Sequence, residues 1–261
     1  MVIPLGDLEK TQIVPIATYV LIALNVVGYF YQQGRDETFT VAYAATPFEI
    51  AHNRDLDRPF VLPLPGDENP LALPGRVDLP ARVVPQAPVP FPVWLTLLTA
   101  MFLHGSPLHL AGNMLYLWIF GDNVEEVLGT VRYVLIYLAC GIAGSLAQIA
   151  AAPESLIPTL GASGAIAGLM GAYLVWFPYN RVRVLLFRFI TEVPAVVVIG
   201  LWIVLQVWSG LGSIGHLGEV GGVAYLAHIG GAFAGILVAL LFQDLARERA
   251  TVAPPSWYDR Y

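Results

Sequence analysis

Residues 161–171 read Gly-Ala-Ser-Gly-Ala-Ile-Ala-Gly-Leu-Met-Gly, a run in which one hydroxyl, that of Ser163, lies among side chains too small to crowd it. Apolar residues continue to Phe177, just before Pro178. We therefore predict a membrane helix over residues 162–177, with Ser163 in its first turn. Backbone N–H groups there have no helical partner, and the positive end of the helix dipole lies beside them. A serine in that place is a candidate nucleophile with donors for an oxyanion nearby.

The same run also has a purely structural interpretation. Gly164 and Gly168 form a small-xxx-small pattern, which commonly packs one membrane helix against another. A serine in such a seam often only hydrogen-bonds a neighbouring helix. The choice between packing and catalysis therefore depends on the rest of the chain.

The composition is that of an integral membrane protein. Of the 261 residues, 57% are hydrophobic and 12% are charged, and the mean hydropathy is +0.67, whereas soluble domains are about one quarter charged. The single cysteine, Cys140, excludes an intramolecular disulfide and a cysteine-based metal site. A net charge of -6 offers no basic patch for nucleic acid, so we exclude nucleic-acid binding.

Hydropathy predicts six membrane-spanning helices, so the expected fold is an all-α polytopic bundle. A span needs about 20 mainly apolar residues. The core covers residues 14–242, after a short polar lead over residues 1–13 and before a tail over residues 243–261. The predicted spans are about Val14–Gln32, Leu108–Phe120, Tyr133–Ala152, Ala162–Phe177, Ile190–Trp208 and Val223–Phe242.

A long loop separates the first two spans. Residues 33–92 hold 11 of the 20 prolines and eight acidic residues, which predicts an extended segment outside the bilayer. Residues 91–102 are apolar again but too few to cross, so we expect them to lie along or dip into the membrane interface. Residues 210–222 contain six glycines and no cation, and we expect this connection to act as a mobile lid above Ser163.

Arginines in the short connections predict the orientation. The short connections after the third and fifth spans hold no Lys or Arg. We therefore expect both termini to be cytoplasmic, in the plasma (inner) membrane, and the proline-rich loop to lie outside. The arginines that favour this orientation are Arg181, Arg183 and Arg188 between the fourth and fifth spans, and Arg247, Arg249 and Arg260 in the tail.

In that orientation, polar side chains on three spans share one level in the outer half of the bilayer. They are His109 and Asn113 on the second span, Ser163 on the fourth and His228 on the sixth. Ionisable residues inside a span are costly and usually functional. Gly231 and Gly235 lie on the same helical face as His228 and allow that face to approach another helix closely.

These positions predict a serine-histidine dyad, in which His228 accepts the proton of Ser163. His109 and Asn113 lie four residues apart on one helical face and are candidate donors to a common oxygen, although both residue types also join helices by hydrogen bonds. A metal site made by His104, His109 and His228 is a weaker interpretation. No Asp or Glu lies at that depth, and the His-Glu-x-x-His spacing is absent. We interpret Gln148 and Gln206 as packing residues.

These motifs resemble those of the rhomboid family of intramembrane serine proteases, in the same order and on the second, fourth and sixth spans. The resemblance covers about residues 14–242. It implies Ser163 as nucleophile, His228 as general base, and an oxyanion hole built from Asn113, the Ser163 backbone N–H and His109. The matching pieces are His104 with His109-Leu-Ala-Gly-Asn113, Gly161-Ala-Ser163-Gly164 with Gly168, and Ala227-His228-Ile-Gly-Gly231-Ala-Phe-Ala-Gly235.

Three positions depart from the family pattern. Trp94-Leu95 stands where a Trp-Arg pair is often found, Gly112 replaces a bulky residue, and Ala167 replaces an aromatic residue four positions after the serine. None of these changes removes a catalytic atom. The aromatic residue can stack on the histidine, so its loss leaves open how His228 is held.

The resemblance implies a protease that cuts a peptide bond in or near the transmembrane segment of another single-span or multi-span membrane protein, without a cofactor. Two rival functions are a rhomboid-like protein that binds membrane clients without cutting them, and a transporter. The presence of both Ser163 and His228 disfavours the first. The absence of an internal repeat and of a midplane charge disfavours the second.

Overall fold

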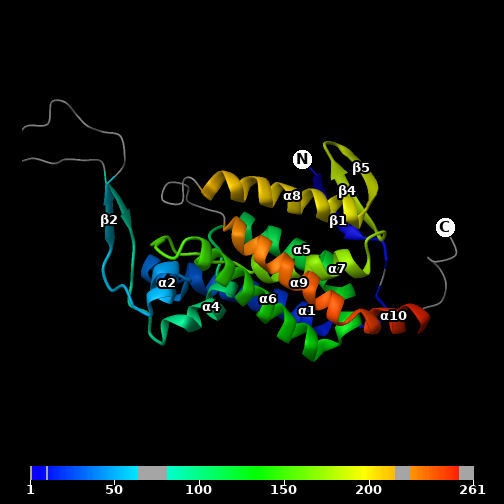
Figure 1. Ribbon diagram of the computed structural model, residues 1–261, viewed down its shortest axis with the longest axis horizontal. Helices are drawn as coiled ribbons and strands as arrows, with labels where there is room; N and C mark the ends of the chain where they lie inside the picture. The colour runs from blue at the N-terminus through cyan, green and yellow to red at the C-terminus, as the bar shows by residue number, and fades with distance from the viewer. Residues whose placement is uncertain (1, 10, 64–80, 215–223, 253–261) are drawn as a thin grey trace, which may run out of the picture.

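The computed structural model describes residues 2–9, 11–63, 81–214 and 224–252 and is mostly helical (Figure 1). Short helical turns η1 (Val93–Leu95), α4 (Thr96–Thr99) and η2 (Ala100–Phe102) precede the second long helix. The long helices are α1 (Ile16–Gln33), α5 (Pro107–Leu128), α6 (Thr130–Ala151), α7 (Ser163–Trp176), α8 (Ala195–Ile214) and α9 (Tyr225–Leu241), followed by α10 (Gln243–Val252).

Helices α6, α7 and α9 form the tightly packed centre of the bundle. Glycines make this possible, because a Cβ at Gly231 would overlap the carbonyl oxygen of Gly164, and a Cβ at Gly235 would overlap that of Gly168. On the α6 side, a Cβ at Gly144 would lie 2.5 Å from the carbonyl oxygen of Ala227. The predicted close approach of the fourth and sixth spans through the face that carries His228 is therefore present.

A buried carboxylate from α5 caps the start of α1. Glu125 is fully buried and accepts hydrogen bonds from the backbone N–H groups of Ala17 and Thr18, at 2.9 and 2.8 Å. The residue before α1 is Pro15, which supplies no side-chain cap. The carboxylate thus satisfies N–H groups that would otherwise be unpaired and lies at the positive end of the helix dipole. It also fixes where α1 meets α5.

The described residues include five strands, which the all-α prediction missed. β1 (Val2–Asp7) pairs antiparallel with β4 (Arg181–Leu186), which pairs antiparallel with β5 (Phe189–Pro194). In β4, alternate residues Val182 and Val184 are buried in the main core. We call the end of the bundle with this sheet the sheet end. The N-terminal lead is thus part of the folded structure.

The segment between the first two spans is also more ordered than an extended loop. It contains helices α2 (Glu37–Tyr43) and α3 (Pro47–His52) and a hairpin of β2 (Phe60–Pro63) and β3 (Ala81–Val84). The hairpin projects from the end of the bundle opposite to the sheet end (Figure 1). Ala45 forms an isolated bridge with Thr159, so this segment contacts the chain just before Ser163.

The helix lengths differ from the predicted spans in several places. Helix α8, which corresponds to the predicted fifth span, begins at Ala195 and not near Ile190, because residues 189–194 form β5. Helix α5, which corresponds to the predicted second span, continues past Phe120 to Leu128. It bends by 81° from residues 93–102, which agrees with an interfacial or dipping segment. Of the predicted lid, residues 210–214 belong to α8, and residues 215–222 lie outside the described residues.

Length and composition identify membrane-crossing helices only in part. Among the described residues, α6 alone is long and apolar enough by itself, and up to three helices qualify when each bent pair counts as one span. The bent pairs are residues 93–102 with α5, and α9 with residues 243–249. Helix α7 and residues 195–211 are apolar but shorter. The structure therefore supports a helical membrane protein with at least one such helix.

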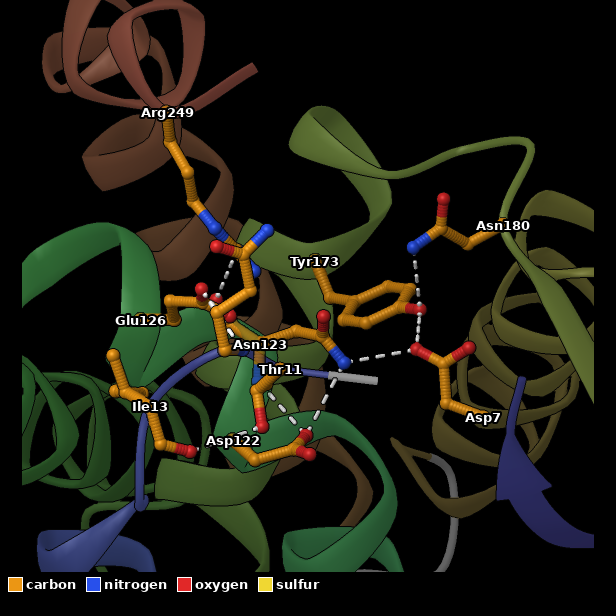
Figure 2. Close-up of polar contacts among 10 residues, drawn as sticks. Asp7, Thr11, Ile13, Asp122, Asn123, Glu126, Tyr173, Asn180 and Arg249 are labelled. Atoms are coloured by element: carbon orange, nitrogen blue, oxygen red, sulfur yellow. Dashed lines mark hydrogen bonds and ion pairs between the residues drawn. The ribbon is translucent and has the colours of Figure 1, made fainter. Parts of the chain in front are cut away.

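A polar cluster joins β1, α5, α7 and α10 at the sheet end (Figure 2). The carboxylate of Asp7 accepts hydrogen bonds from the Tyr173 hydroxyl and, at 2.9 Å, from the Asn123 amide. Arg249 of α10 pairs with Glu126 and donates to the backbone oxygen of Asn123 at 3.2 Å. Four elements distant in the sequence are thus held together by side-chain hydrogen bonds.

Burial raises the pKa of Asp7 to about 6 from an ordinary value of 3.8, which predicts a pH-dependent stability. Between about pH 4 and about pH 6 the folded protein keeps a proton that the unfolded chain has lost, so this group lowers stability as pH rises. We expect the melting temperature of Asp7→Asn to exceed that of the wild type at pH 7.5, by roughly 2–4 °C for each kcal/mol gained in the free energy of unfolding. At pH 4.5 the two melting temperatures should be nearly equal. Thermal unfolding in detergent at both pH values measures this.

Asp36→Asn is the matched control, because hydrogen bonds from Thr38 and the Phe39 backbone lower the pKa of Asp36. A lowered pKa has the opposite sign, so that any stabilising contribution of Asp36 is lost as pH falls. We therefore expect Asp36→Asn not to melt above the wild type at pH 7.5. Equal melting of Asp7→Asn and wild type at both pH values would contradict the role of Asp7.

Candidate active site

Ser163 and His228 meet at the starts of their helices, whereas the sheet strand β4 follows the end of α7. The Oγ atom of Ser163 lies 2.7 Å from Nε2 of His228, within hydrogen-bond distance. Ser163 is the first residue of α7, and His228 lies in the first turn of α9. His228 is only 9% exposed. The structure thus brings together the two residues that the sequence predicts as a dyad.

The position of this pair follows from the glycine contacts between the two helices. Gly164, directly after the serine, presents its carbonyl oxygen to Gly231, three residues after the histidine. Residues three apart lie on one helical face, so the contact that brings the backbones together also brings the two side chains together. Larger residues on either of these helix faces would therefore separate Ser163 from His228.

Two side chains of α8 hold the other sides of the imidazole. The Oε1 atom of Gln206 lies 2.8 Å from Nδ1 of His228. The Trp202 ring lies beside the imidazole, with a centroid separation of 5.7 Å and an interplanar angle of 34°. The sequence interpretation of Gln206 as a packing residue missed this contact. Trp202 supplies an aromatic neighbour that the sequence lacks at Ala167.

Asn113 and His109 converge beside the chain that leads to Ser163. A Cβ at Gly161 would lie 2.9 Å from Nε2 of His109 and 3.7 Å from Nδ2 of Asn113. Gly161 also has a φ of +122°, which favours glycine. The Nδ2 group of Asn113 is buried and has no hydrogen-bond partner among the described residues. This amide is therefore a donor that is available beside Gly161.

The tautomer of His109 makes it a second donor. Its Nδ1 accepts a hydrogen bond from the Gly105 backbone N–H at 3.4 Å. A neutral imidazole that accepts at Nδ1 carries its proton on Nε2. The Nε2–H group of His109 and the amide of Asn113 therefore both lie near Gly161, two residues before Ser163.

His104 packs against His109. Their ring centroids are 5.1 Å apart, and His104 is fully buried. Across residues 2–9, 11–63, 81–214 and 224–252, no group of three His, Cys, Asp or Glu side chains has a geometry that could hold a metal ion. The two rings meet edge to face, at an interplanar angle of 66°.

Comparison with known proteins gives consistent similarities. Residues 92–244, more than half of the chain, match the model of the Rhomboid domain. The chain is 40% identical over 147 residues to the rhomboid protease GluP of Bacillus subtilis. The aligned region covers 56% of this chain and 26% of that protein. It is 30% identical over 171 residues to the mitochondrial Rhomboid protein 1 of Saccharomyces cerevisiae, covering 63% and 47%.

A third similarity, of 30% identity over 159 residues, is to the chloroplastic Rhomboid-like protein 11 of Arabidopsis thaliana, covering 58% of this chain and 53% of that protein. The matched part is therefore between about a quarter and a half of the length of these relatives. The matched residues include all three helices that carry the candidate site.

Proposed function

Because this chain belongs to the rhomboid family, we propose that it is an intramembrane serine endopeptidase that cleaves the transmembrane segments of other membrane proteins. The observation that carries the proposal is the 2.7 Å contact between Ser163 Oγ and His228 Nε2. Nucleophile and base within hydrogen-bond distance are the signature of covalent acyl transfer. The test is cleavage of a transmembrane substrate by the purified protein in liposomes, with the fragments identified by mass spectrometry.

The first half of the reaction forms an acyl-enzyme. As Ser163 Oγ attacks the scissile carbonyl carbon, its proton moves to His228 Nε2, and the carbonyl electron pair moves onto the oxygen. The tetrahedral intermediate then collapses. The C–N bond breaks, and the proton on Nε2 passes to the leaving amine.

The second half repeats these transfers with water. His228 removes a proton from the water that attacks the acyl carbon, and returns it to Ser163 Oγ as the bond between Oγ and the acyl carbon breaks. No cofactor is needed for either half. The substrate must be locally unwound at the cut, because a carbonyl engaged in helical hydrogen bonds is shielded from attack.

The oxyanion formed in both halves needs donors that are already in place. Asn113 Nδ2, His109 Nε2–H and the backbone N–H of Ser163, at the start of α7, are the candidates. Donors fixed in a dry site stabilise developing charge without reorganisation. The position of the Asn113 amide supports this role, because Nδ2 would lie 3.7 Å from a Cβ at Gly161, two residues before Ser163.

Asn113→Ala is expected to lower kcat by a factor of about 100 to 1,000 and to leave KM nearly unchanged, because a donor aimed at the oxyanion acts mainly in the transition state. Steady-state cleavage in liposomes measures both constants. Asn25→Ala is a suitable control, since Asn25 is a buried helical asparagine of α1 whose amide donates to the Leu21 backbone. A wild-type kcat in Asn113→Ala would reduce Asn113 to a helix-packing residue.

We further propose that the site opens to the outer side of the plasma (inner) membrane, with both termini cytoplasmic and six spans. The arginines of the sheet end support this orientation, since Arg181 and Arg183 lie in β4 and Arg249 in α10. Substrates would be single-span or multi-span membrane proteins reached through the bilayer. Protease protection of sealed vesicles, with tags at either terminus, tests the orientation.

A further inference from the structure

The membrane helix α8 carries one amide side chain, and that side chain contacts the proposed base. The apolar part of α8, from Ala195 to Val207, contains Gln206 as its only Asn, Gln or charged residue. An amide in a membrane helix is unfavourable unless it is hydrogen-bonded. Its Oε1 atom lies 2.8 Å from His228 Nδ1. The cost of this residue is therefore offset at the candidate active site.

Gln206 and Trp202 form one face of α8 directed at the imidazole. They lie four residues apart, which places them on the same side of the helix. Trp202 lies beside the ring, and Gln206 reaches its Nδ1 edge, while Ser163 lies at the Nε2 edge. The imidazole is therefore constrained in both its plane and its rotation by residues from two other helices.

We propose that Gln206 is the positioning residue of the reaction, which fixes the tautomer and orientation of His228 from its Nδ1 side. An amide oxygen accepts only, so its contact with Nδ1 requires a proton on Nδ1. The neutral ring then has a free lone pair on Nε2, which faces Ser163 Oγ. This inference rests on the proposed function and adds a third, uncharged member to the dyad.

The Nδ1 proton stays in place throughout the reaction. When Nε2 takes the Ser163 proton, the ring becomes a cation that still donates Nδ1–H to Gln206. The amide dipole, with its oxygen toward the ring, stabilises that cation, although less than a carboxylate would. If the amide instead donated to Nδ1, Nε2 would carry the proton and could not act as a base. The identity of the contacting atom of Gln206 is therefore decisive.

Three variants separate these possibilities. Gln206→Leu removes the acceptor at similar volume, Gln206→Glu keeps an acceptor and removes any donor, and Gln148→Leu is the matched control. Gln148 is a partly buried helical glutamine of α6 whose Oε1 has no partner among the described residues. Each variant is measured as the full chain in liposomes for kcat, KM and the pH profile of kcat/KM, and for its labelling rate with a fluorophosphonate.

We expect Gln206→Leu to lower kcat and the labelling rate by about 10- to 100-fold at unchanged KM, less than the roughly 100- to 10,000-fold that a complete general base contributes. Gln206→Glu should retain most of the rate. The acid limb of the kcat/KM profile of Gln206→Glu should move to higher pH by about one unit, because a nearby negative charge favours the protonated ring of His228. His109 also acts electrostatically on His228 and is unchanged in all variants, so each profile is compared with wild type.

Wild-type rates in Gln206→Leu would overturn the inference, and so would an equal loss in Gln206→Glu with no movement of the acid limb. If Gln206→Leu fails to fold, the pH profile of Gln206→Glu still tests whether Gln206 positions His228. A wild-type protein that neither cleaves nor labels at Ser163 would instead overturn the proposed function, whatever the variants do.

Discussion

Ser163→Ala is expected to reduce substrate cleavage to background while the protein folds and inserts as the wild type does. The change deletes one oxygen at the first residue of α7, next to Gly164, and leaves the packing of α7 on α9 intact. Removal of a catalytic serine costs on the order of a millionfold in rate in a well-studied soluble protease. Cleavage of a transmembrane substrate in liposomes measures the loss.

Thermal unfolding of Ser163→Ala in detergent is the control, and its melting temperature should stay close to that of the wild type. Ser209→Ala, in the last part of α8, tests whether loss of any helical serine has the same effect. Cleavage by Ser163→Ala at more than a few per cent of the wild-type rate would exclude Ser163 as the nucleophile.

Gly231→Leu has the second largest expected effect, because it forces apart the helices that carry the proposed base and the proposed nucleophile. A Cβ at this position would overlap the carbonyl oxygen of Gly164, a backbone atom that cannot move without moving Ser163. A displacement of about 1 Å between base and nucleophile can lower the rate about a hundredfold. We expect insertion to be retained, since leucine is more apolar than glycine.

Gly200→Leu is the matched control, since Gly200 is also a helical glycine and a Cβ there would have nothing within 4 Å. Gly231→Ala is a second test of the contact, because even one methyl group overlaps the Gly164 carbonyl. Each of the three variants is measured for substrate cleavage and for its rate of labelling with a fluorophosphonate. If Gly231→Leu is inserted and reacts at the wild-type rate, the helices do not approach through this face.

The arrangement of the site residues could be predicted from the sequence because it depends on helix direction and on one strong packing pattern. Ser163, His228 and Asn113 lie near the starts of helices that enter the bundle from the same end. Gly231 and Gly235, three and seven residues after His228, predicted the close contact with α7. These signals are local and periodic, so a single sequence contains them.

The contact of Gln206 with His228 was missed because it joins two helices whose rotation the sequence does not fix. Its signal was present, as a lone amide in an apolar helix with an aromatic residue four positions earlier. An amide in a span also commonly joins helices, so the pattern alone did not identify its partner. The structure resolves this by placing Trp202 and Gln206 against the same imidazole.

The strands were missed because hydropathy describes spans better than connections. The alternation of Arg181, Val182, Arg183 and Val184 is a two-residue period that favours a half-buried strand. The same arginines also fit a connection on the cytoplasmic side, so their presence alone does not identify a strand. The partner strand β1 is far away in the sequence, and such pairings are set by tertiary packing rather than by local pattern.

The most direct test of the account is the location and base-dependence of a covalent adduct on the active serine. The solubilised wild-type protein is treated with a fluorophosphonate, and the modified peptide is identified by mass spectrometry, in parallel with His228→Ala. We predict a single adduct on Ser163, formed at least about 100-fold more slowly without the base. An adduct elsewhere, none at all, or equal rates in wild type and His228→Ala would contradict the assignment of Ser163 and His228 as a catalytic pair.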